Sequence, residues 1–211
     1  MRSADAVTLI RVALIVVAAY LILLRFNPFA IILIIAAAML LDAVDGYFAI
    51  RQASGARVGF GTYVKALSGD QSSRKIVREY RGRKTKQSRF GPRIDVAGDR
   101  AVEYIMWAVY TVVGIIPFFV IVIVILRHSF VDAVMAAKGT SSKMKTKFAQ
   151  VIYSSNIFRG GINVVKFLAF SYLALAYISG YPLWIAYVLV AILVIYILVR
   201  GAAEMYEAYS G

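Results

Sequence analysis

Residues 6–24 read AVTLIRVALIVVAAYLILL, and the only charged side chain in this run is Arg11. A helix needs roughly 20 mostly apolar residues to cross a bilayer core about 30 Å thick. Similar apolar runs recur along the 211-residue chain, 61% of which is hydrophobic, and the mean hydropathy is +0.75. The composition therefore excludes an ordinary soluble domain and predicts an integral membrane protein.

The spacing of apolar runs and helix breakers predicts an all-α protein with six transmembrane helices, at about 4–26, 29–50, 94–114, 116–137, 148–178 and 182–205. Between Arg51 and Arg93 there are twelve cations and two acids, and the difference supplies +10 of the formal net charge of +13. Because cytoplasmic loops carry an excess of lysine and arginine, this stretch is expected in the cytoplasm. Alternation of the helices then places both termini there, in a multi-pass protein of the cell membrane.

The chain has no cysteine and a single histidine, so any bound metal must be held mainly by oxygen atoms. The cations of the 51–93 stretch are not interleaved with stacking aromatics, and the rest of the chain is expected in the bilayer. Nucleic acid is therefore not an expected partner. The cations can instead fix the orientation of the chain and contact anionic membrane lipids.

Four aspartates stand near the cytoplasmic ends of two consecutive predicted spans. Asp42 and Asp45 are three residues apart and Asp95 and Asp99 are four apart, so each pair shares one helix face. Antiparallel helices would bring the pairs together, and the repulsion among four carboxylates favours divalent cations between them. Oxygen ligands favour magnesium, manganese or calcium. The alternative is that the aspartates cap helices or pair with the neighbouring arginines Arg51, Arg93 and Arg100.

The sequence around these aspartates is similar to a known signature. Asp42-Ala-Val-Asp45-Gly46-Tyr-Phe-Ala49, followed by Gly91-Pro-Arg-Ile-Asp95-Val-Ala-Gly-Asp99, resembles the signature of the CDP-alcohol phosphotransferases. The resemblance implies a single six-helix membrane domain over 1–211. It also implies a transferase of phospholipid synthesis that moves a phosphoalcohol from a CDP-alcohol to a second alcohol and releases CMP.

Carried over residue by residue, the resemblance gives the aspartates their roles. Two Mg²⁺ ions, or Mn²⁺, would be held by Asp42, Asp45, Asp95 and Asp99, with Asp99 also the catalytic base. The CDP group would contact Asp42, Gly46, Ala49, Arg51, Gly91 and Asp95. One departure is that the family's arginine directly follows the alanine, whereas here Ile50 intervenes, which turns the Arg51 side chain by about 100° on a helix.

A second departure is the length of the chain between the two halves of the signature. Phe60-Gly61-Thr-Tyr-Val-Lys65 is similar to Phe90-Gly91-Pro-Arg-Ile-Asp95, but its lysine stands where a carboxylate is needed. We therefore interpret about 61–90 as a basic cytoplasmic insertion. The insertion could be a lid whose cations bind phosphates, or it could be a flexible basic loop. For most of its cations the second interpretation is slightly favoured.

The acceptor is predicted from cations elsewhere in the chain. Thr8-Leu-Ile-Arg11, then Arg127, then Lys143-Met-Lys145-Thr146 resemble motifs of the phosphatidylglycerolphosphate synthase branch. Charge-assisted contacts from these cations would suit a phosphorylated acceptor, with binding residues Arg127, Lys143, Lys145 and Arg159. Glycerol phosphate is the first choice and inositol phosphate or serine the alternatives. The lipid substrate would be CDP-diacylglycerol or CDP-archaeol, and an exposed apolar face favours a homodimer.

Two other classes of function remain open from the sequence. Carboxylates on membrane helices also form ion paths, which would suit a divalent-cation transporter. The border position of the aspartates argues against it, because transport sites usually lie near the bilayer midplane. A structural membrane protein that recruits partners through its basic stretch would leave the aspartate spacing unexplained.

Overall fold

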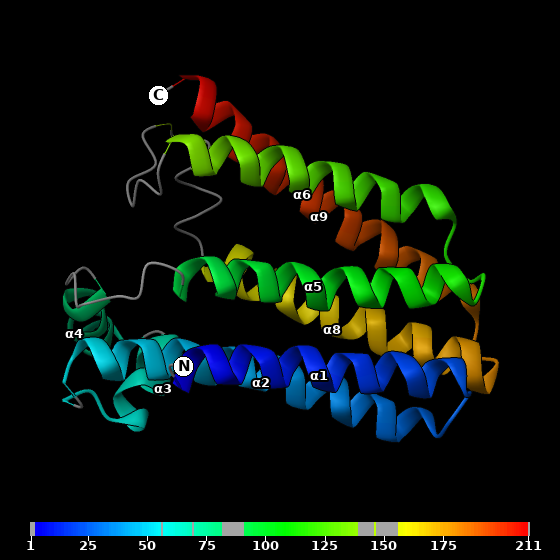
Figure 1. The fold of residues 1–211 in the computed structure, drawn as a ribbon, viewed down its shortest axis with the longest axis horizontal. Helices are drawn as coiled ribbons and strands as arrows, with labels where there is room; N and C mark the ends of the chain where they lie inside the picture. The colour runs from blue at the N-terminus through cyan, green and yellow to red at the C-terminus, as the bar shows by residue number, and fades with distance from the viewer. Residues whose placement is uncertain are drawn as a thin grey trace. The chain divides into compact units, whose positions relative to one another are not determined.

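The computed structural model describes residues 3–55, 57–68, 70–81, 91–138, 146 and 156–210. Within these residues there are eight helices and no strand, which confirms the all-α prediction (Figure 1). The six long helices are α1 (Ser3–Leu23), α2 (Pro28–Ala53), α5 (Gly91–Val112), α6 (Phe118–Lys138), α8 (Asn156–Ser179) and α9 (Leu183–Ser210). The two short helices are α3 (Phe60–Ser68) and α4 (Gln71–Arg81).

Four helices in the described part of the chain are long and apolar enough to cross a membrane. Their apolar parts are Asp5–Leu23, Phe118–Ala136, Gly161–Ser179 and Leu183–Ser210. In α2 the apolar run is shorter and covers Pro28–Asp42. The charged residues of α5 keep its hydropathy low, although the helix is 22 residues long. A membrane-embedded chain is therefore supported, while the count of six spans stays a prediction.

Local sequence signals explain where the long helices end and begin. After α1, Arg25 adopts φ 50°, and the Phe26 amide donates to the Leu21 carbonyl at 3.0 Å, as in a Schellman motif. Asn27 then caps α2, because its Oδ1 accepts the Phe29 amide at 2.9 Å, and Pro28 occupies the first helical position. Gly114 ends α5 in the same left-handed conformation, at φ 79°.

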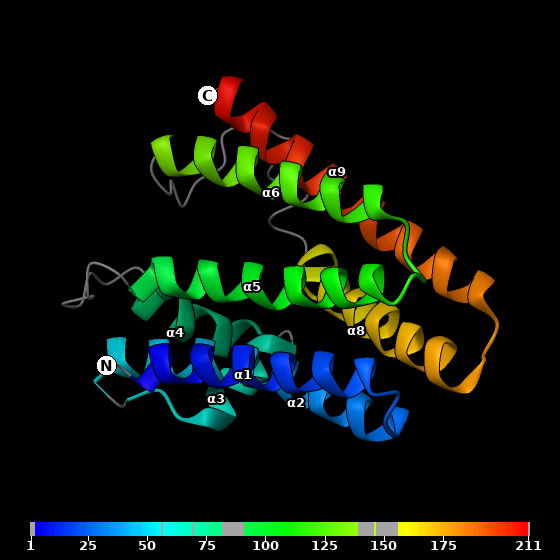
Figure 2. The ribbon, with the colours of Figure 1, turned by 45° about the vertical axis from the view of Figure 1, so that its right-hand side comes forward.

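The described residues form two compact units, each treated separately. One unit comprises Ile15–Ala36 and Glu103–Gly211, and in it α9 packs against both α6 and α8 (Figures 1 and 2). Its core holds large side chains such as Trp107, Tyr110 and Leu173. Large apolar side chains also lie on the outside of the helices, among them Phe118 and Trp184. Such an exterior suits lipid rather than water.

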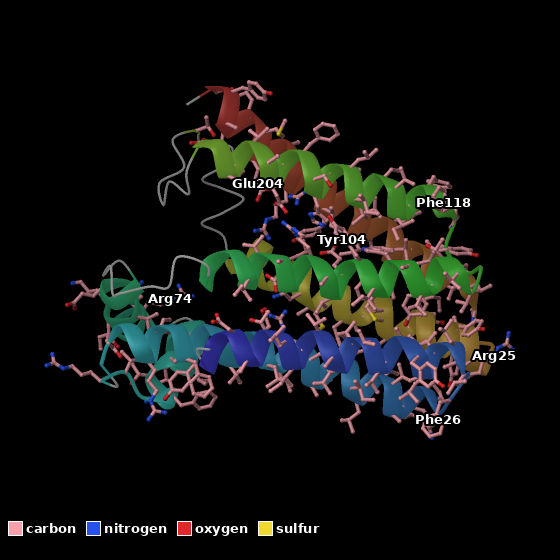
Figure 3. All side chains as sticks on the ribbon, in the orientation of Figure 1. Arg25, Phe26, Arg74, Tyr104, Phe118 and Glu204 are labelled. Carbon is pink, nitrogen blue, oxygen red and sulfur yellow. The ribbon has the colours of Figure 1, made fainter. Side chains whose placement is uncertain are left out.

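The other unit comprises Met1–Leu14 and Ala37–Val102 and contains a helical hairpin, α3 followed by α4. The hairpin packs on the last turns of α2 through a buried cluster of Tyr47, Ile50, Val58, Tyr63, Ala66 and Val77. Residues 60–68 and 71–81 of the predicted insertion are thus helical, and described side chains of both helices take part in this cluster. Arg74, labelled in Figure 3, joins the two helices by donating its Nε hydrogen to the Ala66 carbonyl at 3.1 Å.

Asp70 begins α4 as its N-cap. Its Oδ2 accepts hydrogen bonds from the Ser72 hydroxyl at 2.6 Å and the Ser73 amide at 2.8 Å. These bonds, together with a bond from the Ser73 side chain and the charge of Lys65, lower the pKa of Asp70 from 3.8 to about 2. The ionised carboxylate therefore stabilises the start of the helix.

Candidate functional site

Arg11 brings two of the predicted site carboxylates together. Its side chain, from α1, is 6% exposed; Nη1 lies 2.8 Å from Asp42 Oδ1 on α2, and Nη2 lies 2.9 Å from Asp99 Oδ1 on α5. The carboxylates are more open, with side chains 37% and 47% exposed. One buried cation is thus held between two half-exposed carboxylates that are 57 residues apart in the sequence.

A close helix contact sets this geometry. Gly98, next to Asp99, lies directly against the Thr8 side chain of α1, and a Cβ atom at position 98 would collide with Thr8 Cγ2. Thr8 is only 2% exposed, so it has no room to withdraw. Arg11 follows Thr8 by about one helical turn, which places its guanidinium near Asp99. The T-x-x-R motif and the glycine therefore act together to join α1 to α5.

The other half of each aspartate pair is fixed only at the level of the backbone. Asp45 lies in α2, three residues after Asp42, and Asp95 lies in α5, four residues before Asp99. Their side chains lie outside the described residues. Among the side chains that the structure does describe, no group of three or more histidine or acidic residues could hold a metal ion.

The donor chemistry still fits a divalent cation. Asp42 and Asp99 offer only hard oxygen ligands, and both already face a single positive charge. Among the described residues, Arg11 donates one hydrogen bond here, from Nη2 to Asp99 Oδ1, and its Nη1 forms an ion pair with Asp42 Oδ1. The cation that lies between the two carboxylates in the structure is this guanidinium.

The predicted CDP contacts lie on the same two helices. Gly46 and Ala49 belong to α2, and Gly91 is the first residue of α5; only their backbone positions are described. Arg51 is exposed, and its guanidinium carbon lies 5.9 Å from the centre of the Tyr47 ring. This contact directs Arg51 along α2 toward an aromatic neighbour.

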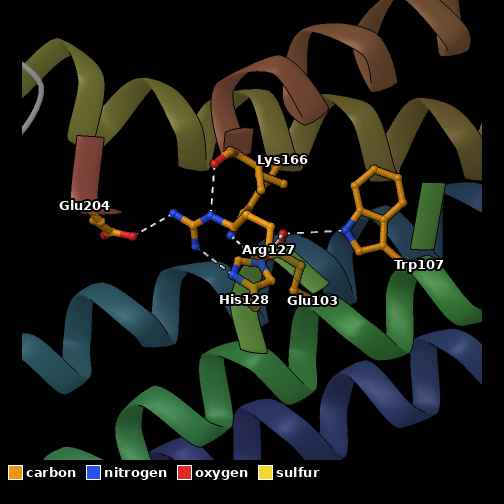
Figure 4. A network of polar contacts seen from close by, with 7 residues as sticks. Glu103, Trp107, Arg127, His128, Lys166 and Glu204 are labelled. Atoms are coloured by element: carbon orange, nitrogen blue, oxygen red, sulfur yellow. Dashed lines mark hydrogen bonds and ion pairs between the residues drawn. The ribbon is translucent and has the colours of Figure 1, made fainter. Parts of the chain in front are cut away.

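Among the predicted acceptor residues, only the side chain of Arg127 is described. Lys143 and Lys145 lie outside the described residues, and so does the side chain of Arg159, whose backbone is in α8. Arg127 is 9% exposed and uses all three guanidinium nitrogens: Nε donates to the Ile197 carbonyl at 3.0 Å, Nη2 to Glu204 at 2.8 Å, and Nη1 contacts His128 Nδ1 at 2.8 Å (Figure 4).

His128 lies between Arg127 and Glu103. A guanidinium can only donate, so the Arg127 Nη1 contact is a hydrogen bond in the tautomer whose Nδ1 accepts. The other ring nitrogen, Nε2, faces Glu103 Oε1 at 3.4 Å. The sequence had suggested no role for this histidine.

Glu103 is the centre of a second polar cluster that sequence reasoning missed. Its carboxylate is 2% exposed and accepts a hydrogen bond from Lys166 Nζ at 2.6 Å, and Trp107 Nε1 lies 3.5 Å away (Figure 4). With Arg127, His128 and Glu204, it forms a buried network across α5, α6, α8 and α9. The sequence did contain a signal for this cluster, because Glu103 is an acidic residue followed by a long apolar run. An acidic residue in a membrane helix usually pairs with another polar side chain and has a functional or structural role.

The end of α9 binds Thr146. Both the amide and the hydroxyl of Thr146 donate to Glu207 Oε2, at 2.9 and 2.6 Å. Glu207 and Glu204 are three residues apart, and both are buried. The last turns of α9 therefore contact both Arg127 and Thr146.

Comparison with known proteins gave no relative: no family model, no curated protein and no solved structure matches this chain.

Proposed function

We propose that this chain is a membrane CDP-alcohol phosphotransferase that transfers a phosphatidyl or archaetidyl group to a soluble alcohol and releases CMP. The observation that carries the proposal is the pairing of Asp42 and Asp99 across one buried guanidinium. These are the first and last aspartates of the resembling signature, and they come from helices far apart in the sequence. A coincidental motif gives no reason for them to meet.

The proposed topology has six spans, with both termini and the α3–α4 hairpin in the cytoplasm. It supports the proposal in two ways. First, α2 and α5, at 26 and 22 residues, are longer than α1 and α6, which have 21 residues each and are apolar enough to cross a membrane. Second, their aspartates flank the cation-rich stretch in the sequence, on the side of the membrane where the water-soluble acceptor would arrive and CMP would leave.

In the proposed reaction, the acceptor hydroxyl attacks the lipid-side phosphorus of the CDP-lipid, a new P–O bond forms and the bond to CMP breaks. Asp99 takes the hydroxyl proton, a role that its 47% exposed side chain allows. Two bound Mg²⁺ ions would neutralise the pyrophosphate and the departing charge. Asp42, Asp45 and Asp95 would hold them, and Arg11 would keep Asp42 and Asp99 in place.

Glycerol phosphate is the proposed acceptor, and inositol phosphate is the second choice. The supporting feature is the cationic set Arg127, Lys143, Lys145 and Arg159. Arg127 as a direct ligand stays a prediction, because each of its nitrogens already has a protein partner. An acceptor phosphate would have to replace one of these contacts.

The test is CMP release by the purified full chain in lipid, with CDP-diacylglycerol or CDP-archaeol, Mg²⁺ and each acceptor in turn. Release that depends on the acceptor and is lost in Asp99→Asn supports the proposal. Asp132→Asn, on α6, is the matched control and should keep its activity. Release that persists in Asp99→Asn, or that no acceptor supports, refutes it; uptake of a divalent cation by liposomes would then favour the transporter.

A further inference from the structure

The α3–α4 hairpin lies just beyond the apolar part of α2. The uncharged run of that helix ends at Asp42, which is its first charged residue, and the hairpin packs on Tyr47 and Ile50. At 1.5 Å per residue these contacts are about 7.5 and 12 Å further along the helix. The headgroup layer adds about 5–7 Å on each side of the hydrocarbon core. A hairpin held at this height is within reach of the headgroups and of the ionic layer outside them.

The outer surface of the hairpin combines apolar and cationic side chains. Phe60, Val64 and Ile76 are 54%, 44% and 44% exposed, although the same helices bury Tyr63, Ala66 and Val77 in their own core. Phe60 and Val64 are one turn apart and share a face of α3. Exposed apolar side chains next to cations can enter the headgroup layer of a membrane.

The described cations of the hairpin, Lys65, Arg74 and Lys75, are exposed as well, and so is Arg57 just before it. The exposed acids among the described side chains of this segment are Asp70 and Glu79. The Asp70 carboxylate already accepts the Ser73 amide hydrogen at the start of α4. Exposed apolar side chains beside lysine and arginine are the composition of helices that lie in the interface of anionic membranes.

We infer that the α3–α4 hairpin docks on the surface of the bilayer that holds the long helices, and that its partner there is anionic lipid headgroups. The apolar side chains enter the headgroup layer and the cations contact lipid phosphates. The inference rests on the proposed course of α2 across the membrane, and it does not depend on the proposed reaction.

The absence of cysteine makes a direct test simple, because every introduced cysteine is unique. Two separate variants of the full chain, Val64→Cys and Ile76→Cys, each receive a spin label on the single cysteine. Each variant is placed in nanodiscs of phosphatidylcholine alone and of phosphatidylcholine with phosphatidylglycerol. The measurement is accessibility of the label to a water-soluble relaxation agent. We expect accessibility to fall several-fold when phosphatidylglycerol is present, and Arg57→Gln combined with Lys75→Gln to remove most of this difference.

A label at Leu33→Cys tests the course of α2 separately from the docking of the hairpin. Leu33 lies in the apolar run of α2 and is 71% exposed in the isolated chain. It should be shielded from water in both lipids. If it is shielded while the hairpin labels stay equally accessible in both lipids, the docking inference is wrong. Equal shielding of the hairpin labels in both lipids would refute the role of anionic headgroups. An accessible Leu33 label would refute the course of α2 and the inference together, whereas CMP release tests the reaction independently.

Discussion

Replacing Glu103 with glutamine removes the one carboxylate that Lys166 contacts in the buried network. The change keeps the shape of the side chain, so it leaves no cavity. It leaves the Lys166 ammonium, whose side chain is 20% exposed, beside a neutral amide oxygen at the position of the present 2.6 Å contact. His128 Nε2, which also faces the carboxylate, loses its charged neighbour as well.

The expected cost follows from the burial of both partners. Removing one member of a buried ion pair typically destabilises a protein by about 3–5 kcal/mol, because the other charge is left without compensation. Lys166 is partly open and can turn its ammonium toward a more polar region, so we expect the lower end, about 3 kcal/mol. Lys166→Met alone should cost a similar amount. The double variant should be more stable than the sum of the two effects predicts, because neither charge is then left unpaired.

Trp107 provides the assay, since its indole lies 3.5 Å from Glu103 and Trp184 is the only other tryptophan. Denaturant unfolding of the purified chain in detergent, followed by Trp107 fluorescence in a Trp184→Phe background, gives the free energy of unfolding. Asp132→Asn is the matched control and should change it little. A cost below about 1 kcal/mol for Glu103→Gln, the range of an exposed pair, would refute the buried network.

Three further predictions concern other contacts. Gly201→Ala places a Cβ 2.6 Å from Arg127 Nε; we expect a loss of about 1–3 kcal/mol from overpacking, larger than the gain in helix propensity, in the same unfolding assay. Gly98→Ala collides with Thr8 and should lower CMP release even in protein that stays folded, as size-exclusion profiles would show. Asp70 has its pKa lowered to about 2, so its stabilisation of α4 is complete above about pH 4 and is lost as the pH falls through 2. As the pH falls, hydrogen exchange of residues 70–75 should therefore become faster in the unmodified chain than in Asp70→Asn, because asparagine keeps the cap without the charge. The same pH dependence of exchange in both proteins would contradict this prediction.

The sequence predicted the helices well because apolar runs and their breakers are local signals. Asn27-Pro28 and Gly114 end or begin helices within a few residues of the predicted positions, since caps and left-handed turns depend only on neighbouring residues. The number of membrane-spanning helices is harder to predict. The length of α5 suits a membrane span, but its charged side chains interrupt the apolar pattern and lower its hydropathy.

The contacts between distant residues could not be predicted in the same way. Glu103 and Lys166 are 63 residues apart, and no spacing rule links side chains on different helices. The motif around Asp42 and Asp99 indicated that carboxylates gather, but it did not show that Arg11 lies between them. The start of α4 was within reach of sequence reasoning, because Asp70 has the character of an N-cap and Ser73 and Val77 are one turn apart on a buried face.

Arg11 gives the carboxylate site a built-in counterion. Because this charge belongs to α1, Asp42 and Asp99 can be kept together while the chain inserts and folds, before any metal ion is supplied. In the proposed reaction, a divalent cation would meet carboxylates whose charge Arg11 already balances in part, and it would share their oxygen atoms with the guanidinium. Arg11 would then lower the affinity of the site for the metal, and its replacement by an uncharged residue would raise that affinity.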